Sequence, residues 1–204
     1  MSRITTEQEL REVYARPVSR GAQQKVIPAL EKHSLDFIAR SPFIMLATKG
    51  ADGLIDISPK GDAPGFVGVD GDKSILIPDR PGNNRLDNLT NLLTDPAIGV
   101  IFLIPGVGET LRVQGNAEIR TDANLLERFS VNGKPPLTII KVDIVEIYLH
   151  CPKAFMRSGL WKPETYTDRK ELPSLGQMIN DQIGLNEVAK SQEELEAGFA
   201  KNLY

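Results

Sequence analysis

The chain has 204 residues, of which 41% are hydrophobic and 25% are charged, a composition typical of a globular protein with one sizeable core. Its formal net charge of -3 gives no indication of nucleic acid or of an anionic membrane surface as a partner, so any anion site must be local. A single cysteine, Cys151, excludes an internal disulfide, and no stretch reaches the ~20 apolar residues of a membrane-spanning helix.

The beginning of the chain is predicted to be helical. It is charged throughout and lacks the apolar core of a signal peptide, so we expect a cytoplasmic protein. Thr6 and Glu9 form a capping-box pattern at the start of an amphipathic helix over residues 6–15. A second helical stretch covers residues 20–40, and Pro28 should kink or divide it because proline interrupts helical hydrogen bonding.

From residue 41 onward, short apolar runs alternate with turn residues, a pattern that predicts β-strands. Glycine and aspartate in the separators favour hairpins. Seven segments fit this pattern, and they cover residues 43–48, 54–57, 66–69, 74–78, 98–104, 110–119 and 137–150. Because only one clear helix interrupts the first six, the pattern predicts a mainly β antiparallel barrel or sandwich with flanking helices.

The last predicted strand changes the side on which its apolar residues lie. Val142 alternates with charged neighbours, whereas Val145 and Ile147 lie on the other parity, and a bulge near Ile144 would explain the change. Cap and stop signals predict the remaining helices at residues 84–93, 121–130, 174–182 and 191–201.

The turn from Asp79 to Arg85 leaves a predicted strand and enters a predicted helix. Unpaired N–H groups at a helix start attract phosphate, and Arg80 and Arg85 would add charge-assisted hydrogen bonds to it. We interpret this turn as a candidate phosphate site. The alternative is that both arginines are surface residues beside Asp79 and Asp87.

Two further features could contact a ligand. The loop at residues 57–62 is made rigid by its proline and glycine, and Lys60 could project a cation toward a planar anionic ligand. Arg112 lies on a predicted strand between apolar neighbours, so it is either a solvated surface residue or a ligand-binding one.

The only tryptophan, Trp161, follows Arg157 and Ser158 closely, and it either covers a flat heteroaromatic ring or anchors the core. The motifs GxSxG, HExxH, CxxC and the P-loop do not occur, and with two histidines we expect neither a catalytic triad nor a metal site. Any chemistry would therefore be carried by a cofactor.

Six segments between Ser41 and Trp161 occur in a characteristic order. They are SPFIMLAT, DISPKGDAPGFV, IPDRPGNNRLDNLTNLL, DPAIGVIFLIPG, ETLRVQGNAEI and HCPKAFMRSGLW. In these segments the chain resembles the FMN-binding split-barrel superfamily of pyridoxamine 5′-phosphate oxidase-like proteins, in particular its PPOX-class probable FMN-dependent enzymes. The resemblance implies a six-stranded antiparallel split β-barrel at residues 41–161. Residues 1–40 would be N-terminal helices packing on the barrel, and residues 162–204 would be a C-terminal helical extension.

The resemblance also implies FMN as the cofactor, bound at the subunit interface of a homodimer. The turn and the helix after it would hold the phosphate, through Arg80, Asn84, Arg85 and Asn88, with Arg112 as a further cation. Asp79, at the start of the turn, would be a further cofactor-binding residue. The residues lining the isoalloxazine would be Ser58, Pro59, Lys60 and Gly61, with Thr110 near its polar edge. The residues contributed by the other subunit would be Arg157, Ser158 and Trp161. Lys60 would lie beside the flavin N1/O2 edge and stabilise the reduced ring.

The function implied by the resemblance is that of an FMN-dependent oxidoreductase acting on a small-molecule substrate, with NAD(P)H or oxygen as the electron partner. The chain departs from the true oxidase, because the Arg-x-His motif is missing after Trp161 and ISPKGD replaces the RxxLLK motif. Oxidation of pyridoxamine phosphate is therefore not expected. The alternatives are a non-catalytic flavin-binding or flavin-sensing protein, or a split barrel that uses haem or F420, with His150 as the candidate haem ligand.

Overall fold

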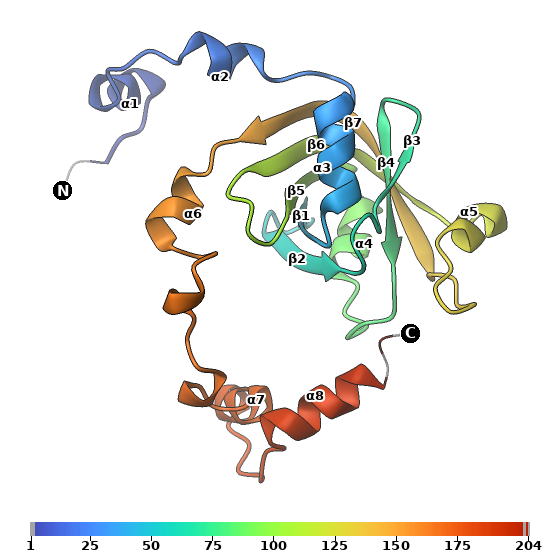
Figure 1. The fold of residues 1–204 in the computed structure, drawn as a ribbon. Helices are drawn as coiled ribbons and strands as arrows, with labels where there is room; N and C mark the ends of the chain where they lie inside the picture. The colour runs from blue at the N-terminus through green and yellow to red at the C-terminus, as the bar shows by residue number, and fades with distance from the viewer. Residues whose placement is uncertain (1–2, 202, 204) are drawn as a thin grey trace.

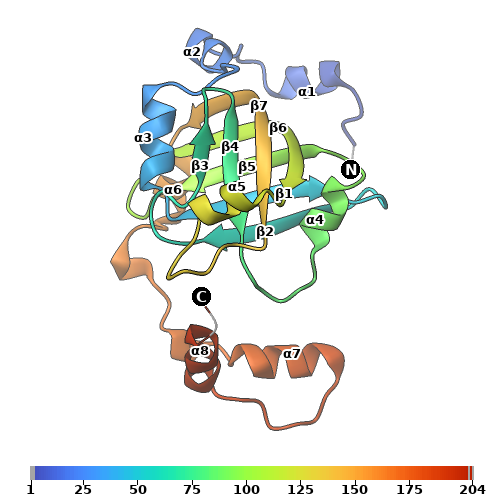
Figure 2. The ribbon, with the colours of Figure 1, turned by 90° about the vertical axis from the view of Figure 1, so that its right-hand side faces the viewer.

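The computed structural model describes residues 3–201 and 203 and shows one antiparallel sheet at its centre (Figure 1). The seven strands are β1 (Phe43–Lys49), β2 (Ile55–Gly61), β3 (Gly68–Asp70), β4 (Ser74–Asp79), β5 (Ala97–Leu103), β6 (Thr110–Arg120) and β7 (Thr138–His150). Their order across the sheet is β2-β1-β5-β6-β7-β4-β3, and every neighbouring pair is antiparallel. Figure 2 shows the sheet twisted so strongly that β3, β4 and β7 run across β1 and β2.

The strand pattern predicted a mainly β antiparallel fold, and the family resemblance implied a barrel of six strands; the observed strands agree with the first and not with the second. All seven segments with a strand pattern form strands, and the mainly β antiparallel architecture with flanking helices is confirmed. The six-stranded barrel implied by the resemblance is wrong. The sheet has two edges, β2 and β3, and no ladder between them is found among the described residues, so the sheet is curled but not closed.

Apolar side chains on the inner face of the sheet form the core. In β1 the alternation is clear, since Ile44 and Leu46 are buried while Phe43 and Met45 lie on the outer, exposed side. β4 is buried along its whole length. The inner face therefore supplies the hydrophobic stabilisation, and the outer face of β1 remains partly uncovered.

The predicted bulge in β7 is confirmed. Gln114 of β6 lies opposite Glu146, but the next residue, Gly115, lies opposite Ile144, so Val145 is the extra residue on β7. Val145 is exposed, whereas Ile144 before it is buried. The bulge thus changes which side of β7 faces the core, as the shift in apolar parity indicated.

Helices flank the sheet. They are α1 (Glu7–Val13), α2 (Arg20–Gln24), α3 (Lys32–Arg40), α4 (Asp87–Leu92), α5 (Ala123–Arg128), α6 (Lys153–Ser158), α7 (Leu175–Ile183) and α8 (Gln192–Ala200), with short 3₁₀ turns at Pro163–Thr165 and Arg169–Glu171. The capping box of Thr6 and Glu9 forms as predicted. The stretch at 20–40 is divided around Pro28, where Ile27 instead pairs with Ile147 of β7.

The helices differ in how they meet the sheet. In the N-terminal segment, α3 packs on the barrel and buries Ser34 and Ile38. No residue of α1, α2, α7 or α8 is buried, and all residues of these four helices are described. Among the described residues, no helix combines the length and the apolar character that a membrane crossing requires.

Asp143 links β7 to β4 through a charged contact that should make stability depend on pH. Its Oδ1 accepts hydrogen bonds from Lys141 Nζ at 2.8 Å and from Ser74 Oγ at 2.7 Å. These two bonds, that of Lys141 first, lower the pKa of Asp143 below its usual 3.8. When folding lowers the pKa of an acidic group, the group stabilises the protein at pH values above its pKa in the unfolded chain. This stabilisation is lost as the pH falls through its pKa in the folded protein.

We therefore expect Asp143→Asn to lose less unfolding free energy than the wild type when the pH is lowered from 6 to 3. Asparagine keeps an acceptor for Ser74 but has no charge to lose. Urea unfolding at several pH values measures the difference. Identical acid sensitivity in both proteins would show that the contact contributes nothing.

Candidate functional site

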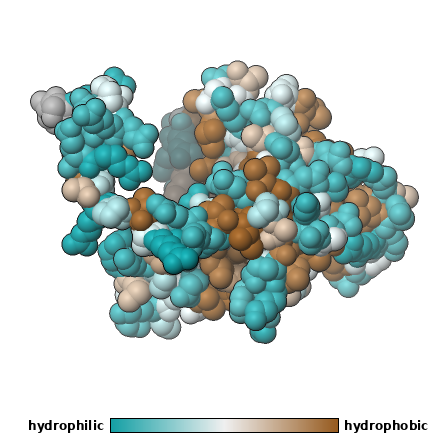
Figure 3. All heavy atoms as spheres, turned by 90° about the horizontal axis from the view of Figure 1, so that it is seen from above, coloured by the Kyte–Doolittle hydropathy of each residue, from teal (hydrophilic) through white to brown (hydrophobic). Residues whose placement is uncertain are grey.

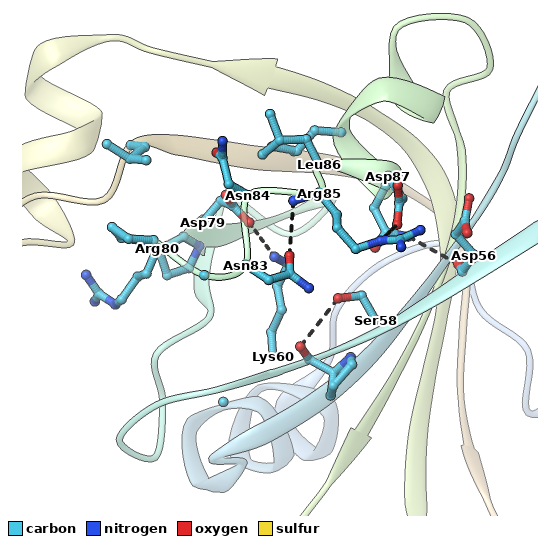
Figure 4. A pocket seen from close by; sticks show the side chains of 18 of the residues that line it. Asp56, Ser58, Lys60, Asp79, Arg80, Asn83, Asn84, Arg85, Leu86 and Asp87 are labelled. Atoms are coloured by element: carbon cyan, nitrogen blue, oxygen red, sulfur yellow. Dashed lines mark hydrogen bonds and ion pairs between the residues drawn. The ribbon is translucent and has the colours of Figure 1, made fainter. Parts of the chain in front are cut away.

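A pocket of about 560 Å³ lies between the edge strand β2 and the connection from β4 to α4 (Figure 4). One wall consists of residues 56–62 and the other of residues 78–89, with Phe66 and Leu137 adding apolar surface. Because β2 is an edge strand, it pairs with β1 on one side only. Its other side leaves backbone donors and acceptors available to a ligand.

The connection between β4 and α4 differs from the predicted helix start. α4 begins at Asp87 and not at residue 84, so Asn84 and Arg85 lie in the turn before the helix. Asn84 and Leu86 have φ angles of 60° and 62°, in the left-handed region that non-glycine residues rarely adopt. The predicted helix start at residue 84 is therefore wrong by three residues. The turn and the first residues of α4 form this wall together, and the binding of an anion there stays a prediction.

Two ion pairs join the walls of the pocket. Lys60 pairs with Asp79, and Arg80 Nε lies 2.6 Å from Asp62 Oδ2. Arg80 also donates to the carbonyl oxygen of Phe129 at 3.2 Å, and its side chain is only 17% exposed. Buried pairs of this kind stay in place, because separating them leaves an uncompensated charge away from water.

Arg85 is the most accessible cation of the pocket. Its Nε lies 2.8 Å from Asp87 Oδ2, and this hydrogen bond raises the pKa of Arg85 above its ordinary value. The Arg85 side chain is 72% exposed. Since exposed ion pairs contribute little to stability, Arg85 can leave Asp87 for an incoming anion at low cost.

Two asparagines of α4 are used to hold the helix on the sheet. Asn88 Nδ2 donates to Thr48 Oγ1 at 2.9 Å and to the carbonyl oxygen of Asp56 at 3.1 Å. Asn91 Nδ2 donates to Thr48 Oγ1 at 3.1 Å and to Asp56 Oδ2 at 2.7 Å. Asn88 was predicted to hold a phosphate, but its amide nitrogen is already engaged by the protein. The sequence analysis did not predict the parts that Asp56 and Asn91 play in these contacts. The only signal for Asp56 was a polar residue in an apolar strand, and the only signal for Asn91 was a polar position on the helix.

The pocket gathers most of the predicted site residues. Those that line it are Ser58, Pro59, Lys60, Gly61, Asp79, Arg80, Asn84, Arg85 and Asn88. The predicted residues that do not line it are Thr110, Arg112, Arg157, Ser158 and Trp161. The acidic partners Asp56, Asp62 and Asp87 also line it and were not predicted as site residues.

The predicted residues outside the pocket make other contacts in the same chain. The Arg112 guanidinium lies over the ring of Tyr148, 5.2 Å from its centroid. Trp161 stacks on Phe155 with 5.5 Å between ring centroids, and its indole N–H donates to the carbonyl oxygen of Val107 at 2.9 Å. Trp161 thus anchors α6 to the hairpin between β5 and β6.

The arrangement suits an anionic ligand of nucleotide size. The pocket volume lies within the ~300–1,000 Å³ typical of small-molecule sites, and an accessible arginine, Arg85, lines it. No His or Cys is among the described residues that line the pocket. Elsewhere in the described chain, no group of three or more His, Cys, Asp or Glu side chains could hold a metal ion.

The comparison with protein families gives the class of protein. The family model described as pyridoxamine 5′-phosphate oxidase matches residues 30–151, which include the whole sheet and both walls of the pocket. The chain therefore belongs to the pyridoxamine 5′-phosphate oxidase family. No curated protein matches the chain significantly.

Several solved structures are similar to the chain. HupZ from Group A Streptococcus is 20% identical, with 58% of this chain and 92% of that chain covered and a TM-score of 0.47. A general stress protein 26 from Bacillus anthracis is 17% identical, with 56% and 89% covered and a TM-score of 0.43. An FMN-binding protein from Syntrophomonas wolfei is 15% identical, with 71% and 96% covered and a TM-score of 0.44.

The two arginines of the pocket turn should differ in their effect on stability. Arg80→Ala leaves the carboxylate of Asp62 buried without its ion pair and should cost about 3 kcal/mol of unfolding free energy. Arg85→Ala breaks an exposed pair and should leave stability nearly unchanged. Chemical denaturation of the two variants makes the comparison. Equal losses would contradict the assignment of Arg80 as a structural residue.

Proposed function

We propose that the protein is an FMN-binding flavoprotein that acts as an FMN-dependent oxidoreductase on a small molecule. The observation that carries this proposal is the pocket between β2 and the β4–α4 turn, with one accessible cation, in a chain of the pyridoxamine 5′-phosphate oxidase family. The bound flavin would supply the hydride-transfer chemistry that the side chains lack. The protein's part is to bind, orient and enclose it.

The residues of the pocket fit FMN in type. Arg85 would hold the phosphate, because it is exposed and can exchange Asp87 for a stronger anionic partner. The β2 wall, from Ser58 to Gly61, would lie along the isoalloxazine. Arg80, which the sequence also assigned to the phosphate, would act indirectly by holding the turn through Asp62.

Lys60 would influence the reactivity of the ring. Its ammonium group lies on the same wall and is paired with Asp79 in a largely buried contact. A cation beside the N1/O2 edge of a flavin favours the anionic reduced ring, and the carboxylate of Asp79 would moderate that effect. Lys60 is thus proposed to stabilise charge on the ring, with Asp79 setting its position.

We further propose a homodimer with FMN between the subunits. Arg157, Ser158 and Trp161 lie outside the pocket of their own chain, and in the dimer they would contact FMN in the pocket of the partner. Thr110 and Arg112 also lie outside that pocket. The substrate is expected to be a small molecule, with NAD(P)H or oxygen as the electron partner.

A non-catalytic flavin-binding or flavin-sensing role is the second candidate. It is favoured because Lys60, Asp62 and Asp79, which could act as a general acid or base, are held in ion pairs. F420 in place of FMN is a further alternative. Haem is less compatible, because His150 ends β7 and does not line the pocket.

Titration of the purified protein with FMN tests the proposal. We expect saturable binding of one FMN per chain, with a shifted flavin absorption band because the ring moves from water into the pocket. An absorption spectrum also separates FMN from haem and F420. A protein that takes up no FMN would refute the flavoprotein assignment, and FMN binding without turnover of NAD(P)H would favour the sensing role.

The role of Arg85 can be tested separately. If Arg85 holds the phosphate, Arg85→Ala should weaken FMN binding roughly ten- to a hundredfold while riboflavin, which has no phosphate, is affected much less. Arg85→Lys keeps the charge but loses the bidentate geometry. Its affinity for FMN should therefore lie between that of the wild type and that of Arg85→Ala. Fluorescence titration with both ligands measures the difference, and equal losses for FMN and riboflavin would contradict the phosphate role.

A further inference from the structure

Two terminal segments stand away from the sheet. The N-terminal arm comprises residues 3–24 with α1 and α2, and the C-terminal arm comprises residues 162–201 with α7 and α8. Figures 1 and 2 agree that the N-terminal arm runs above the sheet and the C-terminal arm below it. In Figure 3 the N-terminal arm projects at the left, and hydrophobic residues gather across the middle of the view.

The C-terminal arm is an ordered structure of its own. The backbone N–H of Leu175 at the start of α7 donates to Gln192 Oε1 of α8 at 3.2 Å, and Ser174 Oγ, at the N-cap of α7, donates to the carbonyl oxygen of Lys190 at 2.9 Å. Its apolar residues nevertheless remain exposed, and they include Leu172, Leu175, Ile179, Ile183 and Phe199. Helices of nine residues are marginal without tertiary packing, so this apolar surface requires a partner.

Both arms leave the barrel at the same end of β7. Ile27, just after the N-terminal arm, exchanges backbone hydrogen bonds with Ile147 at 3.1 and 2.9 Å, and Lys25 Nζ donates to the carbonyl oxygen of Leu149 at 2.7 Å. The C-terminal arm follows α6, which begins three residues after β7 ends and is fixed by Trp161. The arms therefore begin close together and extend to opposite sides of the sheet.

An apolar surface of the sheet lies near these starting points. Strand register places Pro59, Met45, Ile101, Arg112 and Tyr148 side by side across β2, β1, β5, β6 and β7. We call the apolar part of this surface the outer face, and it consists of Phe43, Met45, Ile57 and Ile101, all of them exposed. Lys25 and Arg112 both lie over the ring of Tyr148, so the outer face continues to the root of the N-terminal arm.

The surface area shows how much of the chain is uncovered. The chain exposes 14018 Å², whereas a compact monomer of its mass is expected to expose about 9,500 Å². The excess is about 4,500 Å² per chain and so about 9,000 Å² for two copies, whereas obligate homodimers bury about 2,000–5,000 Å² counted over both partners. The uncovered surface of the outer face and the arms is therefore ample for a stable homodimer interface.

We propose that the two arms of each chain clasp a second copy of the same chain, which lies on the outer face of β2, β1 and β5. This rests on the homodimer of the proposed function and adds the arms as its main contacts. A two-fold axis through the outer face places the arms of each subunit over the other, so that both copies make the same contacts. The arms are then buried in the dimer although they are exposed in one chain.

A pair of charge variants on the C-terminal arm tests the clasp in the full-length protein. Ile183 is 67% exposed in the single chain, so Ile183→Glu should not disturb the barrel, but it should raise the dimer dissociation constant at least tenfold by placing a charge in the apolar contact. Asn186→Glu adds the same charge to an exposed polar position three residues away and should leave the constant unchanged. Sedimentation equilibrium measures both, with circular dichroism as the control for folding.

Photo-cross-linking shows which chain the arm contacts. A benzophenone amino acid at position 183, in a mixture of isotopically light and heavy chains, should give mixed light–heavy cross-links between α7 and the barrel. Cross-links within one chain only, a monomeric wild type, or equal dissociation constants for the two charge variants would overturn the clasp. A dimer that binds no FMN would refute the flavin proposal alone, and FMN binding by a monomer would refute the clasp alone.

Discussion

The ion pairs Lys60–Asp79 and Arg80–Asp62 join β2 to the end of β4. β2 is one edge of the sheet and β4 lies next to the other edge, so the strand order places the two far apart along the ladder. In the described residues no backbone pairing brings these edges together, and the charged side chains connect them instead. The pocket occupies the gap that the open sheet leaves between β2 and the β4–α4 turn, and the two pairs set its width.

The same pairs decide which charge is available to a ligand. Lys60 and Arg80 are largely buried and neutralised by carboxylates, whereas Arg85 is exposed and held only by Asp87. A site with three cations thus presents one of them to solvent. This favours a ligand with its anionic group at the turn and its neutral, planar part along β2, which is the division of charge found in FMN.

The outer face and the arms extend this reasoning to the assembly. The bulge at Val145 turns the end of β7 so that Ile147 faces the core while Tyr148 points outward beneath Lys25 and Arg112. Both arms start there. If the clasp forms, the partner covers Arg112 and the ring of Tyr148 at the end of β7 from which both arms start.

Local features were determined by the sequence itself. The strand segments, the capping box of Thr6, the division at Pro28 and the bulge near Ile144 could be predicted because each depends on residues close together in the chain. The two walls of the pocket could be located because residues 57–62 and 79–85 are each one continuous stretch, but the first was predicted as a rigid loop and instead forms most of strand β2.

Only the tertiary structure decided which of these residues are free to act. The sequence assigned Arg80 and Arg85 the same role, because both lie in one turn and carry the same charge. Arg80 is paired with Asp62, which lies 18 residues earlier, and Arg85 with its near neighbour Asp87. Burial and pairing with distant residues depend on how the sheet curls, which local patterns do not encode. For the same reason the sequence could place Trp161 near a ligand or in the core, but its contact with Val107 follows only from the fold.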